Sequence, residues 1–284
     1  MDKSLSLSAQ QLQIIKEKST EYPFSGQFNE LNQSGTYLCR QCGLALYRSS
    51  SKFHSGCGWP SFDNQIDNHV KQMPDPDGKR TEILCNRCNA HLGHIFSGEQ
   101  FTPNNIRHCV NSISLDFVVD PNITDSEEII LAAGCFWGVE YLFQQLNGIV
   151  KTECGYIGGS TNNPIYKEIC HGDTGHLEAV RIIFDRTIIP LEAVIKYFFE
   201  IHDPSQRNRQ GPDIGNQYHS AVFYYTEEQK QVTKSLIQEL EQKKISIATS
   251  VLPMAVFWPA EDYHQNYYNK QNKLPYCHFY QKKF

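Results

Sequence analysis

The 284-residue chain lacks any apolar run of the ~20 residues that a bilayer-spanning helix needs. Its first residues, 1–13, also lack the basic-then-apolar pattern of a secretory signal, so we expect a cytoplasmic protein without membrane contact. An excess of basic charge is missing as well, because the net charge is −5. Residues 1–120 carry 11 Lys or Arg against 12 Asp or Glu, and residues 121–284 carry 15 against 19. Neither half is basic, which argues against a nucleic-acid partner.

The chain also lacks an internal repeat, so its two halves are not copies of one another. Its length suits two domains. After a short capped amphipathic helix over 8–19, residues 35–119 contain short β-like segments between turns and no convincing helix. We therefore predict a mainly β N-terminal domain over 1–119. The polar, proline-containing segment 120–127 is the expected linker to a second domain over 128–284.

In the second domain, strand and helix patterns alternate. Strands are predicted over 129–132, 149–157, 179–184 and 220–225, and helices over 137–146, 191–201 and 227–242. Pro190 suits the first turn of the second helix, and Thr226 suits the cap of the third. This alternation favours an α/β fold of the α+β sandwich kind.

Cysteine is abundant, with 10 in the chain, and four of them form two CxxC pairs. The pairs are Cys39 with Cys42 and Cys85 with Cys88. In a reducing compartment, cysteines more often indicate metal binding or thiol chemistry than a disulfide framework. Two CxxC turns together can form a closed tetrahedral thiolate cage, which suits one structural zinc ion. Redox-active CxxC pairs and two disulfides are the alternatives.

Cys109 is the first candidate for a reactive cysteine. It lies two residues after Arg107, so the two side chains share a face in a strand. A neighbouring guanidinium favours the thiolate and lowers the thiol pKa from ~8.5. Cys57 could then form a disulfide with an oxidised Cys109, and His91 and His94 could donate protons to an oxygen being reduced. Alternatively, each of these residues has an ordinary packing or metal-binding role.

Several stretches of this half together resemble the B-type methionine sulfoxide reductases. They are the CxxC pairs, GCGWPSF at 56–62, RTEILCNRCNAHLGHIF at 80–96 and RHCVNS at 107–112. The resemblance covers roughly residues 7–119. It implies the B-type fold with one structural zinc ion and no organic cofactor.

By this resemblance, Cys109 is the nucleophile and Cys57 is the resolving cysteine. Trp59 packs on the substrate methyl group. The implied substrate site also contains Arg107 and the groups that position and protonate the sulfoxide, which are His91, His94 and Asn111. His108 stands where the family usually has Tyr, and this departure bears on substrate contact but not on the reaction.

Cys135 is the second candidate, because it lies between a predicted strand and a predicted helix. A helix N-terminus stabilises a thiolate through its free N–H groups and its dipole. Phe136 and Trp137 can form an apolar wall for an S-methyl group. Glu178 begins another strand and can deliver a proton if apolar walls raise its pKa. The alternatives are a plain buried turn and an exposed carboxylate.

Residues 128–284 resemble the A-type methionine sulfoxide reductases. The motifs are GCFWG at 134–138, GDTGHLEAV at 172–180, HDP at 202–204, RQGPDIGNQY at 209–218 and AEDYHQ at 260–265. The resemblance implies that Cys135 is the nucleophile and that Glu178 is the proton donor. The remaining implied residues are Phe136 and Trp137 in the methyl pocket, Tyr166, Asp213 and Tyr218 as hydrogen-bonding groups, and Cys277 as the resolving cysteine on a mobile tail. Cys154 and Cys170 are either inert or competing resolving cysteines.

The two resemblances imply a bifunctional repair enzyme. It would reduce the S epimer of methionine sulfoxide in the C-terminal domain and the R epimer in the N-terminal domain. Thiolate attack would give a sulfenic acid, then a disulfide that thioredoxin or an equivalent dithiol reduces. Free methionine sulfoxide and oxidised proteins both fit as substrates. A zinc-ribbon binding module joined to an α/β domain and a thiol peroxidase are the rival interpretations.

Overall fold

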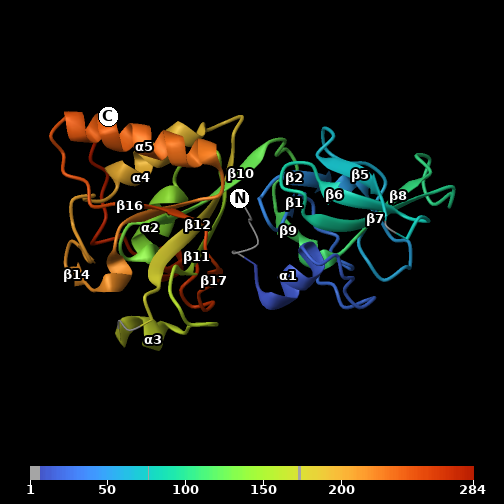
Figure 1. Ribbon diagram of the computed structural model, residues 1–284, viewed down its shortest axis with the longest axis horizontal. Helices are drawn as coiled ribbons and strands as arrows, with labels where there is room; N and C mark the ends of the chain where they lie inside the picture. Colours follow the sequence, from blue (N-terminus) through green and yellow to red (C-terminus); the bar gives the residue numbers. More distant parts are fainter. Residues whose placement is uncertain (1–6, 76, 172–173) are drawn as a thin grey trace. The chain divides into compact units, whose positions relative to one another are not determined.

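The computed structural model describes residues 7–75, 77–171 and 174–284, and it divides after Glu127 into two compact units (Figure 1). The first unit is coloured blue to green in Figure 1, and the second is coloured green to red. Within the described residues, no helix is long and apolar enough to cross a membrane. Each unit is built around its own core.

The N-terminal unit is strand-rich, as predicted, and contains two antiparallel sheets. One sheet has the order β2 (Ala45–Arg48), β1 (Thr36–Cys39) and β9 (Leu115–Val118). The other has the order β3 (Lys52–Phe53), β4 (Ser61–Phe62), β8 (Ile106–Val110), β7 (His91–Ser97), β6 (Thr81–Cys85) and β5 (Val70–Pro74). Between residues 35 and 119, the described part contains only short 3-10 turns besides strands.

The core of this unit is aromatic. Tyr37, Tyr47 and Phe62 are fully buried, and the rings of Tyr47 and Phe62 stack with centroids 4.3 Å apart. Helix α1 (Ala9–Ile15) precedes the sheets and has the predicted capping box. It ends before the predicted helix does.

The C-terminal unit has a mixed six-stranded sheet. Its order is β16 (Ser250–Pro253), β15 (Ala221–Tyr224), β10 (Ser126–Ala132), β12 (Leu177–Asp185), β11 (Ile149–Ile157) and β17 (Phe257–Pro259). β15 and β16 are parallel, whereas β10–β15, β11–β12 and β11–β17 are antiparallel pairs. The unit also contains a short hairpin of β13 (Arg209–Gln210) and β14 (Asp213–Ile214).

Both faces of this sheet are apolar, and alternate residues of β10 show why. Ile129 and Leu131 belong to the core that includes side chains of α2 (Phe136–Phe143), α4 (Leu191–Glu200) and α5 (Glu227–Gln242). Ile130 and Ala132 belong to a second core on the other face, which includes Met254 and Phe257. The sheet is therefore covered on both sides.

Several elements match the sequence-based expectation, and others do not. β11 and α5 have the predicted bounds, and Thr226 caps α5 by accepting a hydrogen bond from Gln229 N. α3 (Tyr166–His171), α6 (Tyr267–Gln271) and the short strands β13, β14, β16 and β17 were not predicted, whereas β15 lies within the strand predicted over 220–225. β10 begins at Ser126, so the last two residues of the expected linker are strand and not connecting chain. Of the GDTGHLEAV motif, Gly172 and Asp173 lie outside the described residues.

Candidate active sites and metal centre

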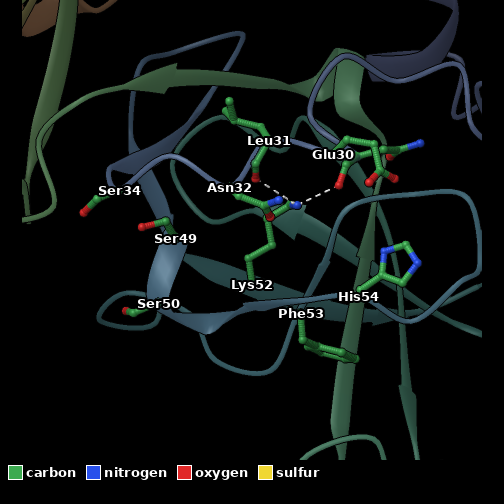
Figure 2. Close-up of a pocket in the computed structure, with 10 residues that line it drawn as sticks. Glu30, Leu31, Asn32, Ser34, Ser49, Ser50, Lys52, Phe53 and His54 are labelled. Atoms are coloured by element: carbon green, nitrogen blue, oxygen red, sulfur yellow. Dashed lines mark hydrogen bonds between the residues drawn. The ribbon is translucent and has the colours of Figure 1, made fainter.

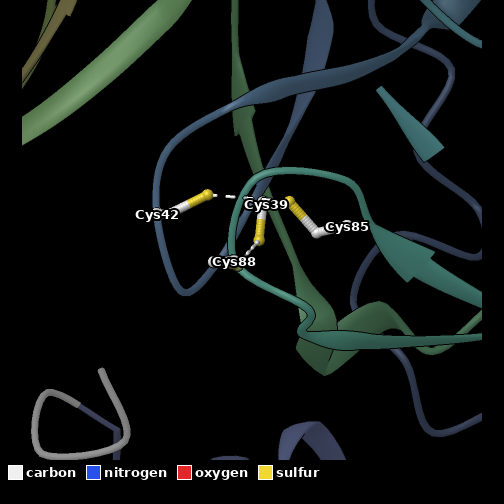
Figure 3. A group of neighbouring side chains, drawn as sticks. All are labelled: Cys39, Cys42, Cys85 and Cys88. Carbon is white, nitrogen blue, oxygen red and sulfur yellow. Dashed lines mark hydrogen bonds between the residues drawn. The ribbon is translucent and has the colours of Figure 1, made fainter. Parts of the chain in front are cut away.

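The two CxxC pairs of the N-terminal unit converge on one point (Figure 3). The Sγ atoms of Cys39 and Cys88 are 3.6 Å apart, those of Cys42 and Cys85 are 3.7 Å apart, and all four lie within 4.8 Å of one another. A tetrahedral zinc ion with bonds of ~2.3 Å separates its sulfur ligands by about 3.8 Å. The donor set and its spacing therefore fit zinc, and all four cysteines are free.

The local backbone explains why these sulfurs meet. After the first pair, Gly43 has a φ of 71° and donates from N to Cys39 O at 2.8 Å. After the second pair, Asn89 has a φ of 60° and donates to Cys85 O at 2.9 Å. Each pair thus forms the same tight turn, closed by a residue in the left-handed region, which glycine and asparagine tolerate best.

Cys109 occupies the middle of a row of side chains across the six-stranded sheet. In the register, Cys109 of β8 faces Ser61 of β4 on one side and His94 of β7 on the other. His94 in turn faces Glu82 of β6. Directly opposed residues of antiparallel strands project to the same side. Strand pairing alone therefore places the thiol, the imidazole and the carboxylate on one face.

Cys57 reaches the same place from the loop between β3 and β4. Its Sγ is 3.7 Å from Cys109 Sγ, and Ser55 Oγ donates to it at 3.0 Å. The hydrogen bond from Cys109 lowers the pKa of Cys57 to about 4, against the opposing effect of burial. The same hydrogen bond and burial raise the pKa of Cys109. The two sulfurs share one proton, so at neutral pH a single negative charge belongs to the pair.

Arg107 also acts on this charge, but it has a partner that was not anticipated. Its guanidinium lowers the pKa of Cys109, against the larger effects of Cys57 and burial. It also binds Glu99 in a bidentate pair, with Nε–Oε2 at 2.7 Å and a second contact at 2.9 Å. It lies over the Phe96 ring, 4.4 Å from the centroid. Glu99 thus fixes Arg107 and offsets part of its charge.

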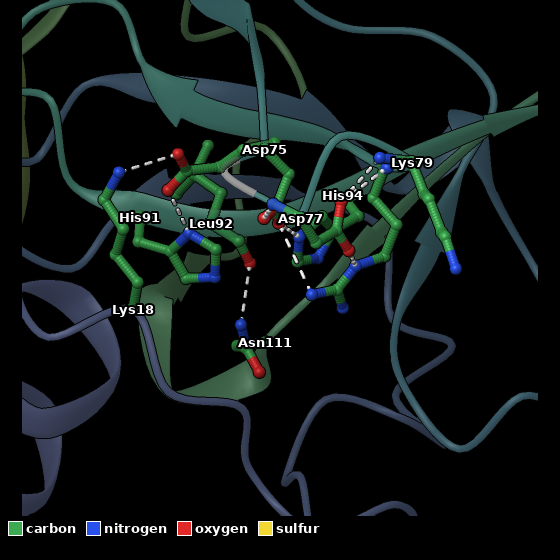
Figure 4. Close-up of polar contacts among 10 residues, drawn as sticks. Lys18, Asp75, Asp77, Lys79, His91, Leu92, His94 and Asn111 are labelled. Atoms are coloured by element: carbon green, nitrogen blue, oxygen red, sulfur yellow. Dashed lines mark hydrogen bonds and ion pairs between the residues drawn. The ribbon is translucent and has the colours of Figure 1, made fainter.

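The two predicted histidines are each held by a carboxylate (Figure 4). His94 Nε2 is 2.6 Å from Asp75 Oδ2, and His91 Nδ1 is 2.6 Å from Glu82 Oε1. Lys18 Nζ donates to the second oxygen of Glu82 at 2.8 Å. The rings of His91 and His94 lie 5.7 Å apart. The structure therefore brings both imidazoles together, with their orientation fixed by acidic partners.

Asn111 and Trp59 are tied to the backbone in this structure. Asn111 Nδ2 donates to Leu92 O at 3.2 Å, and Asn111 Oδ1 accepts from Glu21 N at 3.1 Å. Trp59 Nε1 donates to Glu21 O at 3.2 Å. The Asn111 amide thus has a backbone partner at each end, and the segment around Glu21 holds the indole in place.

His108 does not lie on the face of the sheet that carries Cys109. It faces Phe62 and Ile95 across β8, on the opposite side of the strand from Cys109. Its Nδ1 is 3.1 Å from the Tyr47 hydroxyl, and burial lowers its pKa to about 4. The departure from the family pattern is therefore in the core, and our expectation that it bears on substrate contact finds no support in this geometry.

A groove of about 630 Å³ lies on the same unit (Figure 2). Its lining includes Asn29, Lys52 and His54. Lys52 Nζ donates to the backbone oxygens of Asn29 and Leu31 at 2.7 and 3.1 Å. A smaller hollow shares Phe53 and His54 with this groove and reaches Trp59. The groove therefore leads to the loop that carries Cys57.

In the C-terminal unit, Cys135 occupies the N-cap position of α2, as the sequence predicts. The next residue, Phe136, donates its backbone N–H to Glu178 Oε2 at 3.2 Å. Glu178 is only 1% exposed, and burial raises its pKa to about 8. It is therefore protonated at neutral pH and can act as a proton donor next to Cys135.

The C-terminal tail is docked at this site. The Sγ atoms of Cys135 and Cys277 and a carboxylate oxygen of Asp213 all lie within 4.8 Å of one another. Tyr276 donates its hydroxyl to Asp213 Oδ1 at 3.1 Å. The hydrogen bond with Cys135 lowers the pKa of Cys277 to about 6, against burial, and raises that of Cys135. As at the first site, two sulfurs share a proton.

Aromatic side chains form a wall next to Cys135. Trp137 stacks on Tyr267 with centroids 3.7 Å apart, and its Nε1 donates to His264 Nδ1 at 3.0 Å. The His264 ring also packs against Phe136 at 5.0 Å and Tyr166 at 4.5 Å. His264 was not among the predicted site residues. The signal was available, because His264 belongs to the AEDYHQ motif.

The two remaining cysteines differ in their surroundings. Cys154 is fully buried, its Sγ is 3.7 Å from Phe136 O, and burial raises its pKa well above the usual value. These features describe an inert core thiol. Cys170 is exposed on α3, one helical turn after Tyr166.

Tyr218, another predicted site residue, lies in a 3-10 turn. Burial raises the pKa of its hydroxyl, and the charge of Glu178 is the next cause.

Comparison with known proteins gives matches to both halves. Residues 7–119 match the family model described as SelR domain, and residues 127–284 match the one described as Peptide methionine sulfoxide reductase. The peptide methionine sulfoxide reductase MsrA of Pasteurella multocida is 46% identical over 153 residues, which cover 54% of this chain and 88% of the relative. The MsrA of Thermus thermophilus is 46% identical over 155 residues, with the same shares covered. Among solved structures, reduced Mxr1 from Saccharomyces cerevisiae aligns with a TM-score of 0.53 and 34% identity, over 57% of this chain and 94% of that one.

Proposed function

The chain belongs to the peptide methionine sulfoxide reductase family, and we propose that it reduces both epimers of methionine sulfoxide at two separate sites. The observation that carries the proposal is a pair of free cysteines in each unit, Cys57 with Cys109 and Cys135 with Cys277. The sulfoxide sulfur is chiral, and opposite epimers need different pockets. We assign the S epimer to residues 128–284 and the R epimer to residues 1–119, with 120–127 between them.

At the C-terminal site, Cys135 is the proposed nucleophile. Its thiolate is favoured by the N-terminus of α2, and it attacks the sulfoxide sulfur. Glu178 gives its proton to the leaving oxygen, since burial keeps this carboxyl protonated at neutral pH. Phe136 and Trp137 contact the methyl group, while Tyr166, Asp213 and Tyr218 are the proposed hydrogen-bonding groups.

At the N-terminal site, Cys109 is the proposed nucleophile and Cys57 the resolving cysteine. Arg107 draws the shared negative charge of the pair toward Cys109. Trp59 contacts the methyl group. The proposed groups that orient and protonate the sulfoxide are His91, His94 and Asn111, two of which are held by carboxylates. The groove that leads to the Cys57 loop supports a protein-bound substrate at this site.

The same reaction cycle is proposed for each of the two sites. Thiolate attack releases methionine and leaves a sulfenic acid, and the resolving thiol condenses with it to give a disulfide and water. An external dithiol then reduces the disulfide, and we propose thioredoxin or an equivalent reductant in the cytoplasm. The four-cysteine cage holds the proposed zinc ion, which has no open coordination position and therefore stabilises the fold without taking part in the reaction.

Thiol counting after one round of oxidation tests this proposal. Reduced protein is mixed with racemic methionine sulfoxide without a reductant, then quenched in acid and mapped by mass spectrometry. We expect loss of four of the 10 thiols and exactly two new links, Cys57–Cys109 and Cys135–Cys277. A Cys154→Ser variant is the control and should give the same map. Oxidation by hydrogen peroxide but not by methionine sulfoxide would instead indicate a thiol peroxidase.

A further inference from the structure

His278 immediately follows the proposed resolving cysteine and touches its sulfur. His278 Nδ1 is 3.0 Å from Cys277 Sγ, and His278 Nε2 is 2.7 Å from the carbonyl oxygen of Ala133. The imidazole is only 4% exposed. It therefore lies between the tail and the turn that carries Cys135, with both ring nitrogens engaged.

The partner of Nε2 decides the tautomer. A carbonyl oxygen can only accept a hydrogen bond, so Nε2 must carry a proton and donate it to Ala133 O. In the neutral ring, Nδ1 then has a free lone pair, which accepts a hydrogen bond from Cys277 whenever Cys277 is a thiol. The hydrogen bond to Ala133 O, near the proposed nucleophile, thus leaves Nδ1 of His278 unprotonated where it faces the sulfur of Cys277.

The GCFWG motif leaves room for this ring. A Cβ at Gly138 would come too close to His278 Nδ1 and would lie 3.1 Å from its Cγ. A Cβ at Gly134 would lie 3.5 Å from His278 Nε2 and would collide with Gln210. Gly134 also has a φ of 96°, which favours glycine. Gly138 therefore allows the ring to approach the start of α2, whereas glycine at position 134 is required by Gln210 and by the backbone conformation.

The other ionisable groups near the ring do not supply the same function. His202, which follows α4, stays neutral, because burial lowers its pKa to about 3. Asp213 raises the pKa of Cys277 and therefore opposes ionisation. Cys135 hydrogen-bonds to Cys277 in the reduced state. Once Cys135 is a sulfenic acid, its thiol hydrogen is gone, and the Nδ1 contact of His278 remains.

We propose that His278 is a catalytic residue of the C-terminal site, which removes the proton of Cys277 when the disulfide forms. The proposal rests on the proposed function. The proton of Cys277 moves to Nδ1, and the thiolate sulfur attacks the sulfur of Cys135–SOH. The S–S bond forms as the S–O bond breaks, the leaving hydroxide takes up one proton to give water, and Nδ1 releases the proton that it took from Cys277, so the imidazole ends neutral. Cys277 is oxidised, Cys135 is reduced, and the sum is thiol plus sulfenic acid giving disulfide plus water.

A His278→Gln variant tests the step, because glutamine can hydrogen-bond but cannot accept a proton at neutral pH. The full chain carries Cys109→Ser, so that only the C-terminal site turns over. One equivalent of the S epimer is added without a reductant, and methionine release and sulfenic acid decay are followed separately from pH 6 to 9. A thiol with a pKa of ~8.5 is only about 3% thiolate at pH 7. We therefore expect sulfenic acid decay about 30-fold slower in the variant at pH 7.

The expected pattern has three parts. Methionine release stays at the parental rate, sulfenic acid decay slows at pH 7, and this loss shrinks toward pH 9, where Cys277 ionises unaided. Phe279→Ala, a change at the neighbouring exposed tail residue, should keep the parental profile. Unchanged decay in His278→Gln would overturn the proposal. Equal slowing at every pH would overturn it too, since it would show a purely positional effect. If the parent releases no methionine, the proposed function itself fails.

Discussion

Replacing Glu178 with Gln gives the most quantitative prediction. Glu178 is nearly fully buried, and burial raises its pKa from 4.5 to about 8. Gln has the same shape, can still accept from Phe136 N, and does not titrate. Any pH-dependent difference in stability between the two proteins therefore reports the ionisation of this one carboxyl.

The sign and size of this difference follow from linkage. Below pH 4.5 the carboxyl is protonated in both the folded and the unfolded chain, so it adds no pH dependence. Between pH 4.5 and about 8 only the unfolded chain loses the proton, and the free energy of unfolding falls as the pH rises. At ~1.4 kcal/mol per pH unit, the total loss in wild type is about 5 kcal/mol. Above the folded pKa the difference stays constant.

Urea unfolding of wild type and Glu178→Gln at a series of pH values measures this difference. The exchange of amide hydrogens in β12 identifies the transition of the C-terminal unit. We expect the advantage of the Gln variant to grow by about 5 kcal/mol from pH 4.5 to 8, while its S-epimer reduction at pH 7 falls by ~10²–10⁴. A flat stability difference over this range would show that Glu178 is ionised in the folded protein and would refute the proton-donor argument.

Three further predictions concern the N-terminal unit. Cys88→Ser removes one ligand of the cage, so metal analysis should show loss of the zinc ion together with R-epimer reduction, while S-epimer reduction persists. Phe62→Ala opens a cavity at a fully buried ring and should cost ~3–5 kcal/mol in urea unfolding of this unit. His108→Phe leaves the Tyr47 hydroxyl without its partner and should cost ~1–3 kcal/mol. Its R-epimer kcat/KM should stay at the wild-type value, and a large loss would place His108 in the substrate site.

Features set by local chain geometry were predictable from the sequence. The CxxC spacing indicates a tight turn, and each pair forms one. The cap at Thr226 and the span of α5 follow from adjacent residues alone. The motif at 134–138 indicates a strand-to-helix turn, and Cys135 lies at the helix N-cap. Each of these interactions joins residues close together in the sequence.

Features set by tertiary contact were not predictable in the same way. Glu99 pairs with Arg107 across a loop of irregular sequence, and nothing in that loop indicates the pairing. His278 reaches Ala133, which is 145 positions away in the sequence. The placement of His108 is an intermediate case. Once Arg107 and Cys109 share one face of β8, the residue between them must project to the other, and this alternation was available from the sequence.

The most direct test of two independent sites is reduction of separated S and R epimers of a methionine sulfoxide substrate with dithiothreitol. Wild type, Cys135→Ser and Cys109→Ser are compared under the same conditions. We expect that wild type reduces both epimers, that Cys135→Ser loses only the S epimer, and that Cys109→Ser loses only the R epimer. Loss of both epimers in either variant, or reduction of neither by wild type, would contradict it.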